Sequence, residues 1–174
     1  SCLHNYGFFE DHGIKPEYYV SLDAGEICLP EMSQGGSRKK SDGNVDANYY
    51  WDSTEDKTLV AVTTTYPPVL DKWKGKVLFF NILVPDQNFQ EEAHKITNFK
   101  LVFSTGGNTL GACMYLAKAY LGANPVAFVG ADFSFGYKEA FHPFDSPYDK
   151  QFKGVIFVPD VFGNLVGTWP SYYN

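Results

Sequence analysis

Leu101-Val102-Phe103-Ser104-Thr105-Gly106-Gly107-Asn108-Thr109 is the stretch that decides the fold, because it leads from an apolar run through a glycine pair into a helical pattern. The apolar residues after it recur at the i, i+3, i+4 spacing that gathers side chains on one helix face: Leu110, Cys113, Met114, Ala117 and Leu121. Gly122 favours the end of that helix. We therefore predict a strand over 101–103, a tight turn and a helix over 109–121.

The rest of the chain also alternates between short apolar runs and helical patterns. The apolar runs predict strands over 18–22, 59–63, 77–80 and 126–129, and the remaining patterns predict helices over 3–12, 67–73 and 88–95. Residues 155–158 and 165–168 flank Gly163-Asn164 and predict an antiparallel hairpin. This order is typical of an α/β fold: a Rossmann-like, mostly parallel sheet with helices on both faces and a C-terminal β-hairpin.

The length and composition favour one folded domain. The chain has 174 residues, of which 44% are hydrophobic and 17% aromatic, so it can bury one core but not two comfortable ones. We expect a single Rossmann-like domain over 1–174. Residues 30–48 are rich in Gly, Ser, Lys and Asn, and we interpret them as a mobile loop. The opening residues, 1–4, resemble the middle of a helix, so we expect a missing beginning.

Charge and cysteine content exclude several classes of protein. The formal net charge of -6 argues against a nucleic-acid-coating or membrane-surface protein, since both need a basic face. No apolar run approaches the roughly 18 residues of a membrane span, and no signal peptide is visible, so we expect a cytoplasmic protein. The three cysteines are widely spaced, which predicts neither a disulfide framework nor a zinc knuckle.

Polar residues follow most of the predicted strands, where ligands of open α/β sheets bind. They are Asp23, Thr64, Asn81, the run Ser104 to Thr109, Gly130 and Asp132. Loops are commonly polar for no functional reason, but the agreement across several strand ends favours a crevice for a polar ligand. We therefore take these residues as a candidate binding site.

The turn over 104–109 is the strongest part of this candidate site. Gly106 and Gly107 let the backbone approach a ligand closely, and the free N–H groups of the following helix attract an anion. Thr105, Asn108 and Thr109 add hydrogen-bonding side chains. The run is neither a Walker A loop nor G-x-G-x-x-G, so it predicts a phosphate or nucleotide cradle only by its geometry. The alternative is a tight strand–helix turn with an Asn or Thr cap.

Candidate catalytic residues lie beyond the last predicted parallel strand. Asp132 is placed to hold a ribose hydroxyl or a metal, or to orient a base, and it can equally cap a turn. Ser134 and Tyr137 follow within an aromatic segment. His142 is our candidate for proton transfer, because the pKa of an imidazole lies near neutrality, although an isolated loop histidine is more often inert.

Several ordered segments together resemble a known domain family. They are 13–16 (Gly-Ile-Lys-Pro), 19–23 (Tyr-Val-Ser-Leu-Asp), 73–77 (Trp-Lys-Gly-Lys-Val), 105–109 (Thr-Gly-Gly-Asn-Thr), 121–125 (Leu-Gly-Ala-Asn-Pro) and 129–132 (Val-Gly-Ala-Asp). The set resembles the domain shared by bacterial flagellar motility accessory factors and the archaeal 6-hydroxymethylpterin diphosphokinase, the MptE-like family. It also resembles bacterial sialyltransferases that use CMP-sialic acid.

The resemblance implies a Rossmann-like domain that binds a nucleotide or nucleotide sugar. Thr105, Gly106 and Gly107 would contact the nucleotide, Gly130 and Asp132 its ribose or base, and Asp23 matches a strand-terminal acid of the family. The family's first strand, with its Gly-Pro-Ser-like turn, has no counterpart here.

Three functions remain open. The first is a metal-free glycosyltransferase-like enzyme that uses a CMP-sialic-acid-like donor, with His142 deprotonating the acceptor. The second is a Mg²⁺-dependent 6-hydroxymethylpterin diphosphokinase, in which Asp23 or Asp132 would hold the ion against ATP phosphates. The third is a non-catalytic nucleotide-binding or assembly module. In each case the expected partner is a small-molecule nucleotide, with no nucleic acid, no membrane span and a possible homo-oligomer.

Overall fold

The computed structural model describes residues 1–98, 102–131, 134–136 and 154–170 of the chain. Two compact units form, Ser1–Val126 and Ala127–Asn174, and each is described here by itself. The single domain expected over 1–174 stays a prediction. Asp132, Tyr137 and His142 lie outside the described residues.

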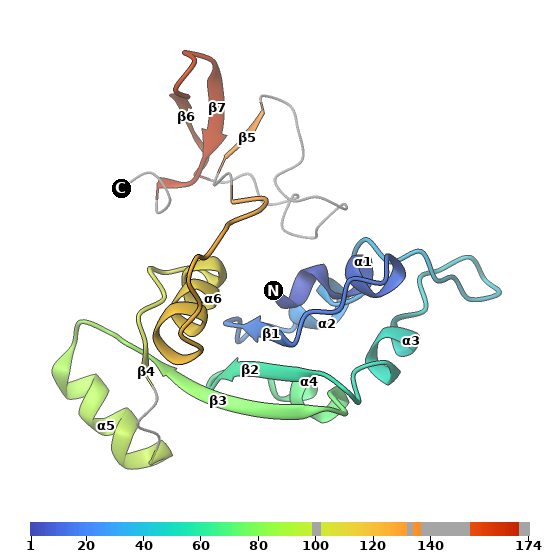
Figure 1. The fold of residues 1–174 in the computed structure, drawn as a ribbon, viewed down its shortest axis with the longest axis horizontal. Helices are drawn as coiled ribbons and strands as arrows, with labels where there is room; N and C mark the ends of the chain where they lie inside the picture. Colours follow the sequence, from blue (N-terminus) through green and yellow to red (C-terminus); the bar gives the residue numbers. More distant parts are fainter. Residues whose placement is uncertain (99–101, 132–133, 137–153, 171–174) are drawn as a thin grey trace. The chain divides into compact units, whose positions relative to one another are not determined.

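The first unit is built on a four-stranded parallel sheet (Figure 1). Its strands are β1 (Tyr18–Ser21), β2 (Thr58–Val62), β3 (Lys76–Ile82) and β4 (Val102–Phe103), in that spatial order. Val20 pairs with Val60 and Val60 with Leu78, whereas β4 pairs only with the last residues of β3, Asn81 and Ile82. Because every pair is parallel, the carboxyl ends of all four strands meet at one edge of the sheet.

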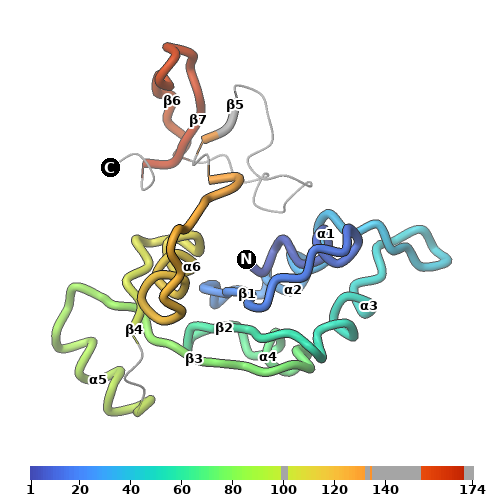
Figure 2. The backbone as a smooth tube through the Cα atoms, in the orientation of Figure 1, coloured from blue at the N-terminus to red at the C-terminus, as the bar shows by residue number. Residues whose placement is uncertain are grey.

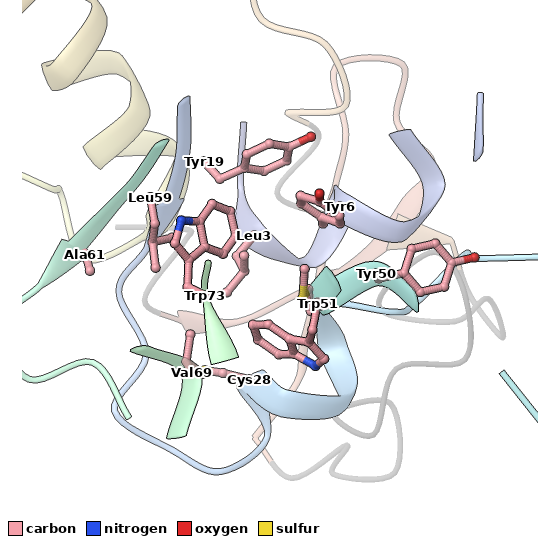
Figure 3. Packing of buried hydrophobic residues seen from close by; sticks show 11 residues of the cluster. Leu3, Tyr6, Tyr19, Cys28, Tyr50, Trp51, Leu59, Ala61, Val69 and Trp73 are labelled. Atoms are coloured by element: carbon pink, nitrogen blue, oxygen red, sulfur yellow. The ribbon is translucent and has the colours of Figure 1, made fainter. Parts of the chain in front are cut away.

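One face of the sheet is covered by the helices that precede β1, those between β1 and β2, and the helix between β2 and β3. These elements are η1 (Leu3–Asn5), α1 (Tyr6–Asp11), α2 (Cys28–Glu31), α3 (Ala47–Asp52) and α4 (Pro67–Lys72). Leu59 and Ala61 of β2 pack there against Tyr6, Trp51 and Trp73 (Figure 3). Aromatic side chains make up much of the core on this face, where the ring centroids of Tyr6 and Tyr19 lie 4.8 Å apart.

The opposite face carries a second core under α6 (Thr109–Tyr115), which continues directly into η2 (Leu116–Tyr120). Val60 and Val62 of β2 point to this side and pack with Phe80, Phe103 and Ala112. The backbone trace runs from β4 into α6, which lies against the sheet (Figure 2). The prediction of a parallel α/β sheet with helices on both faces is confirmed.

α5 (Gln87–Thr97) confirms the helix expected at 88–95 and extends it by two residues at its end. It starts at an N-cap, Asp86, whose side chain accepts a hydrogen bond from the backbone N–H of Phe89 at 3.1 Å. It ends at Asn98, which has a positive φ of 52°. None of the helices in the described part of the chain has the length and apolar character that a membrane crossing requires.

The segment expected to be a mobile loop, 30–48, begins inside α2 and ends inside α3. Its middle is tied to α1 through the carboxylate of Asp11, which accepts hydrogen bonds from the backbone N–H of Ser37 and from the hydroxyl of Tyr50, the latter at 2.8 Å. The backbone N–H of Arg38 donates to the same tyrosine oxygen at 3.0 Å. The mobility of this segment stays a prediction.

The second unit contains an antiparallel sheet of β5 (Phe135–Gly136), β7 (Leu165–Thr168) and β6 (Ile156–Pro159), in that order. The predicted hairpin is confirmed, with the carboxylate of Asp160 accepting hydrogen bonds from the backbone N–H groups of Phe162 and Asn164 across the turn.

The strand expected over 126–129 is wrong. These residues form no strand, and Val129 is 95% exposed. A short apolar run becomes a strand only where a neighbouring strand offers hydrogen bonds. The hydrophobic pattern of the run does not indicate whether such a neighbour is present.

Candidate functional site

The glycine turn, defined as Ser104 to Asn108, connects β4 to α6 at the carboxyl edge of the parallel sheet. Gly106 and Gly107 have φ values of +60° and +82°, a conformation that L side chains rarely adopt. Both glycines are exposed, and a Cβ atom at either position would have nothing within 4 Å. The sequence therefore needs glycine here for its backbone angles, and the outer surface of the turn is open.

Side chains of the glycine turn stabilise its shape from within. The hydroxyl of Thr105, a residue that is only 4% exposed, accepts a hydrogen bond from the backbone N–H of Gly107 at 3.2 Å. Asn108 is the N-cap of α6, and its side-chain oxygen accepts from the backbone N–H of Gly111 at 2.8 Å. The capped-turn alternative is thus correct for Asn108. The Asn108 cap accepts only the N–H of Gly111, and the backbone N–H groups of Thr109 and Leu110 have no acceptor among the described residues.

Gly111 is a third glycine of this corner, and the sequence analysis did not single it out. A Cβ atom there would lie 1.9 Å from the backbone oxygen of Thr105. The first turn of α6 therefore lies so close to the glycine turn that only glycine, which has no Cβ atom, fits at position 111. A glycine inside an otherwise apolar helix pattern was the signal that could have identified it.

A small cavity of about 20 Å³ lies at the carboxyl end of β1. Its walls come from the strand end, from α2 and from the first residue of α6: Ser21, Asp23, Cys28, Glu31 and Thr109, with Cys2, Leu3, His4 and Val20 completing it. The structure thereby brings together two predicted site residues, Asp23 and Thr109, that are far apart in the sequence. The cavity has room for a water molecule or an ion and none for a nucleotide.

A larger cavity of about 220 Å³ lies between β1 and the end of α6. Its walls include Pro16, Val20, Leu116 and Leu121, and it contains none of the predicted site residues. We therefore place the candidate site at the glycine turn and the small cavity beside it.

Asp23, Cys28 and Glu31 form the acidic cluster of the small cavity, with one carboxylate or sulfur atom from each within 4.8 Å of the others. Burial, with a contribution from the Asp23 charge, raises the pKa of Glu31 to about 7. Burial of its carboxyl group also raises the pKa of Asp23. The thiol of Cys28 donates to the backbone oxygen of Asp23 at 3.6 Å, and burial raises its pKa to about 12.

Cys28 and Glu31 were missed by the sequence analysis, which considered only the wide spacing of the cysteines. Their signal is a spacing of three residues, which places both side chains on one face of α2. That helix follows directly after the strand-terminal Asp23. Glu31 is only 8% exposed. Its burial depends on tertiary packing, which the local sequence pattern does not indicate.

The remaining predicted site residues lie elsewhere or outside the described part. Asn81 is buried in β3, where its side-chain oxygen accepts from the hydroxyl of Thr63 at 2.8 Å and its amide donates to Thr97 at 3.1 Å. Gly130 and Ser134 belong to the second unit. The binding or catalytic roles of these residues, and of Asp132, Tyr137 and His142, stay predictions.

Comparisons with known proteins agree with this fold. The model of the family described as 6-hydroxymethylpterin diphosphokinase MptE-like matches residues 2–138. The structure of the MAf glycosyltransferase from Magnetospirillum magneticum AMB-1 superimposes with a TM-score of 0.60 at 16% sequence identity, over 99% of this chain and 23% of that one. The likeness shows a shared fold, and this chain spans about a quarter of that protein's length. A search of the curated proteins finds no match.

Proposed function

The chain belongs to the 6-hydroxymethylpterin diphosphokinase MptE-like family, and from that membership we propose that it is a nucleotide-binding transferase of glycosyltransferase type that uses a CMP-sialic-acid-like donor. The observation that carries the proposal is the open glycine turn at the carboxyl edge of a parallel sheet, where the N–H groups of Thr109 and Leu110 have no acceptor in the part of the chain that the structure describes. A phosphate group is the ligand that such a corner favours.

The donor's phosphate would lie on the outer surface of the glycine turn. Gly106 and Gly107 have no side chain to keep it away, and no neighbouring atom occupies the space in which a Cβ would lie. The N–H groups of Thr109 and Leu110 would donate to the phosphate oxygens and stabilise the negative charge that grows as the phosphate leaves. His142 would remove the proton from the acceptor hydroxyl.

A second candidate function is the pterin diphosphokinase that the family's description names. Its Mg²⁺ ion would need a site made of oxygen ligands, since Mg²⁺ binds carboxylates, phosphates and water. The acidic cluster includes the thiol of Cys28, which is a soft ligand that Mg²⁺ does not prefer. The cluster therefore does not fit a Mg²⁺ ion, and we assign no step of a kinase reaction to it. Family membership alone supports this candidate.

Thermal-shift measurements with CMP, CDP, UDP, ATP and GTP, each with and without Mg²⁺, test the proposal. A ligand that binds the folded state raises the melting temperature by linkage. We expect a rise with cytidine nucleotides that does not require Mg²⁺. A rise with ATP and Mg²⁺ alone would favour the diphosphokinase, and no rise with any nucleotide would contradict both enzymes and favour a non-catalytic module.

A matched pair of variants locates the binding site. Gly107→Asp and Gly107→Asn place side chains of equal size and similar backbone strain at an exposed position, and only the first adds a negative charge. We expect Gly107→Asp to abolish the nucleotide-induced shift through repulsion of the phosphate, and Gly107→Asn to keep most of it. Equal shifts in the two variants would place the nucleotide elsewhere.

A further inference from the structure

Asp23, Cys28 and Glu31 present two carboxylates and a thiol to one small cavity. Their ligand atoms lie within 4.8 Å of one another, and the cavity measures about 20 Å³. In a tetrahedral zinc site the ligand atoms lie about 3.5 Å apart, which follows from Zn–S and Zn–O bonds of about 2.0–2.3 Å. Small rotations of two flexible carboxylates bridge this difference. The site therefore has the size and the reach for a single ion.

The carboxylate of Glu31 has no partner that compensates its burial. The residue is 8% exposed, and among the described residues neither its carboxylate nor that of Asp23 forms an ion pair or a hydrogen bond. Buried carboxylates normally pair with a cation or coordinate a metal, because an unpaired buried charge is expensive. Glu31 is such a group, and its carboxylate lies within 4.8 Å of the exposed carboxylate of Asp23, so a cation between the two would offset their repulsion.

The ligand atoms, two carboxylate groups and one sulfur, indicate which metal ion the site would bind. Oxygen ligands alone would suit Mg²⁺ or Ca²⁺, but a cysteine in the set favours a borderline or soft metal such as Zn²⁺. Cys28 lies beside the aromatic core of the first unit (Figure 3), which keeps water away from one side of the cavity. Cys2 and Thr109 also line the cavity.

We propose that Asp23, Cys28 and Glu31 bind one Zn²⁺ ion at the carboxyl end of β1. The ion binds the thiolate, so the S–H proton of Cys28 is released to solvent when the Zn–S bond forms. The ion joins the end of β1 to α2 and neutralises both carboxylates. Zinc binding therefore stabilises the first unit without any nucleotide, and the proposal does not depend on the transferase function.

Cobalt substitution tests the site, because Co²⁺ in a zinc site reports its ligands by its colour. The full chain, freed of metal with a chelator and kept reduced, is titrated with Co²⁺ and then with Zn²⁺. We expect one equivalent of Co²⁺ to produce the visible bands of a tetrahedral ion and a thiolate-to-cobalt charge-transfer band, and Zn²⁺ to displace it. Zn²⁺ should raise the melting temperature, and Mg²⁺ at the same concentration should not.

Matched variants identify the ligands. Cys28→Ser should remove the charge-transfer band, because Cys28 is the thiol ligand of the proposed site. Glu31→Gln should weaken Co²⁺ binding by about tenfold or more, since even the loss of an outer-shell partner costs about 10–100-fold. Glu26→Gln, at an exposed position just before α2, should leave binding unchanged.

Three outcomes would overturn the zinc site: no charge-transfer band in the unaltered chain, a band that survives Cys28→Ser, or Mg²⁺ competing as well as Zn²⁺. Should Cys28→Ser fail to fold, Glu31→Gln decides, and an affinity within about twofold of the unaltered chain would contradict the proposal. A chain that binds Co²⁺ but no nucleotide would support the zinc site and contradict the transferase, so the two proposals fail separately.

Discussion

Gly111 and Gly107 are glycines for different physical reasons. Gly111 has an ordinary helical backbone but no space, because a Cβ atom would lie 1.9 Å from the backbone oxygen of Thr105. Gly107 has space but a φ of +82°, which disfavours any other residue. The glycine pair could be predicted as a special turn from its place between an apolar run and a helical pattern. The role of Gly111 could not, because a steric contact across the corner leaves no periodic signal.

Gly111→Ala should therefore destabilise the chain strongly. The added methyl group forces α6 away from the glycine turn, and we expect a loss of about 3 kcal/mol, at the upper end for overpacked sites. Gly107→Ala should cost only about 1–2 kcal/mol, the penalty of a left-handed backbone. Urea denaturation followed by circular dichroism measures both. A Gly111→Ala chain as stable as Gly107→Ala would contradict this account of the corner.

Asn108 should contribute to stability through its cap. Asn108→Ala removes the acceptor for the N–H of Gly111, and we expect a loss of about 1 kcal/mol in the free energy of unfolding. Asn108→Asp retains the side-chain oxygen and serves as the control. If the alanine and aspartate variants unfold at the same urea concentration, the hydrogen bond to Gly111 does not stabilise the helix.

At the scale of elements, short apolar runs predicted five parallel strands, of which four are present in the sheet and the one at 126–129 is not. β2 is apolar from Leu59 to Val62, where both of its faces are covered, and this is typical of a central parallel strand. The run at 126–129 is equally apolar, yet it found no strand to pair with, and Val129 is 95% exposed. The local sequence pattern indicates which segments can form strands. Whether a segment does so depends on a second strand, far away in the sequence, that lies beside it.

The segment between α2 and α3 should respond to acid through Asp11. Burial acts to raise the pKa of Asp11, but hydrogen bonds from Ser37 and Tyr50 and the nearby Arg38 together hold that pKa below its usual value. An acid with a lowered pKa stabilises the folded state above its unfolded pKa of about 3.9, and this contribution is lost as the pH falls through the folded pKa.

Asp11→Asn should accordingly melt at a lower temperature than the unaltered chain at pH 7, and the difference should shrink below about pH 4, where the aspartate becomes neutral. Melting curves between pH 2 and 8 measure this effect. Asp71→Asn, at an exposed position in α4, is the control and should follow the unaltered chain. A difference for Asp11→Asn that does not change with pH would show that its charge is irrelevant.

At the scale of the whole molecule, the division into two units was not visible in the composition, because both units use the same aromatic and β-branched residues. The first unit contains both cores, and it includes the buried Trp51 and Trp73. Family resemblance predicted the fold class of this unit well. It could not place the acidic cluster, because burial of Glu31 depends on how α2 packs against the end of β1.

The first unit should fold by itself, because the described residues of its two cores all lie before Val126. We expect a chain of residues 1–126 to unfold cooperatively, with the blue-shifted fluorescence of buried tryptophans. The full chain carrying Trp169→Phe is the reference, since its remaining tryptophans are those of the first unit. A fragment with the emission of exposed tryptophan and no cooperative transition would contradict the expectation.

Thr109 begins α6 at the end of the glycine turn and also forms part of the wall of the small cavity. It therefore belongs to two neighbourhoods at once, the first turn of the helix and the cavity. In evolutionary terms such a residue is doubly constrained, because a change that suits one neighbour must also be tolerated by the second. Divergence within the family at this position would therefore require compensating changes at the strand end of β1.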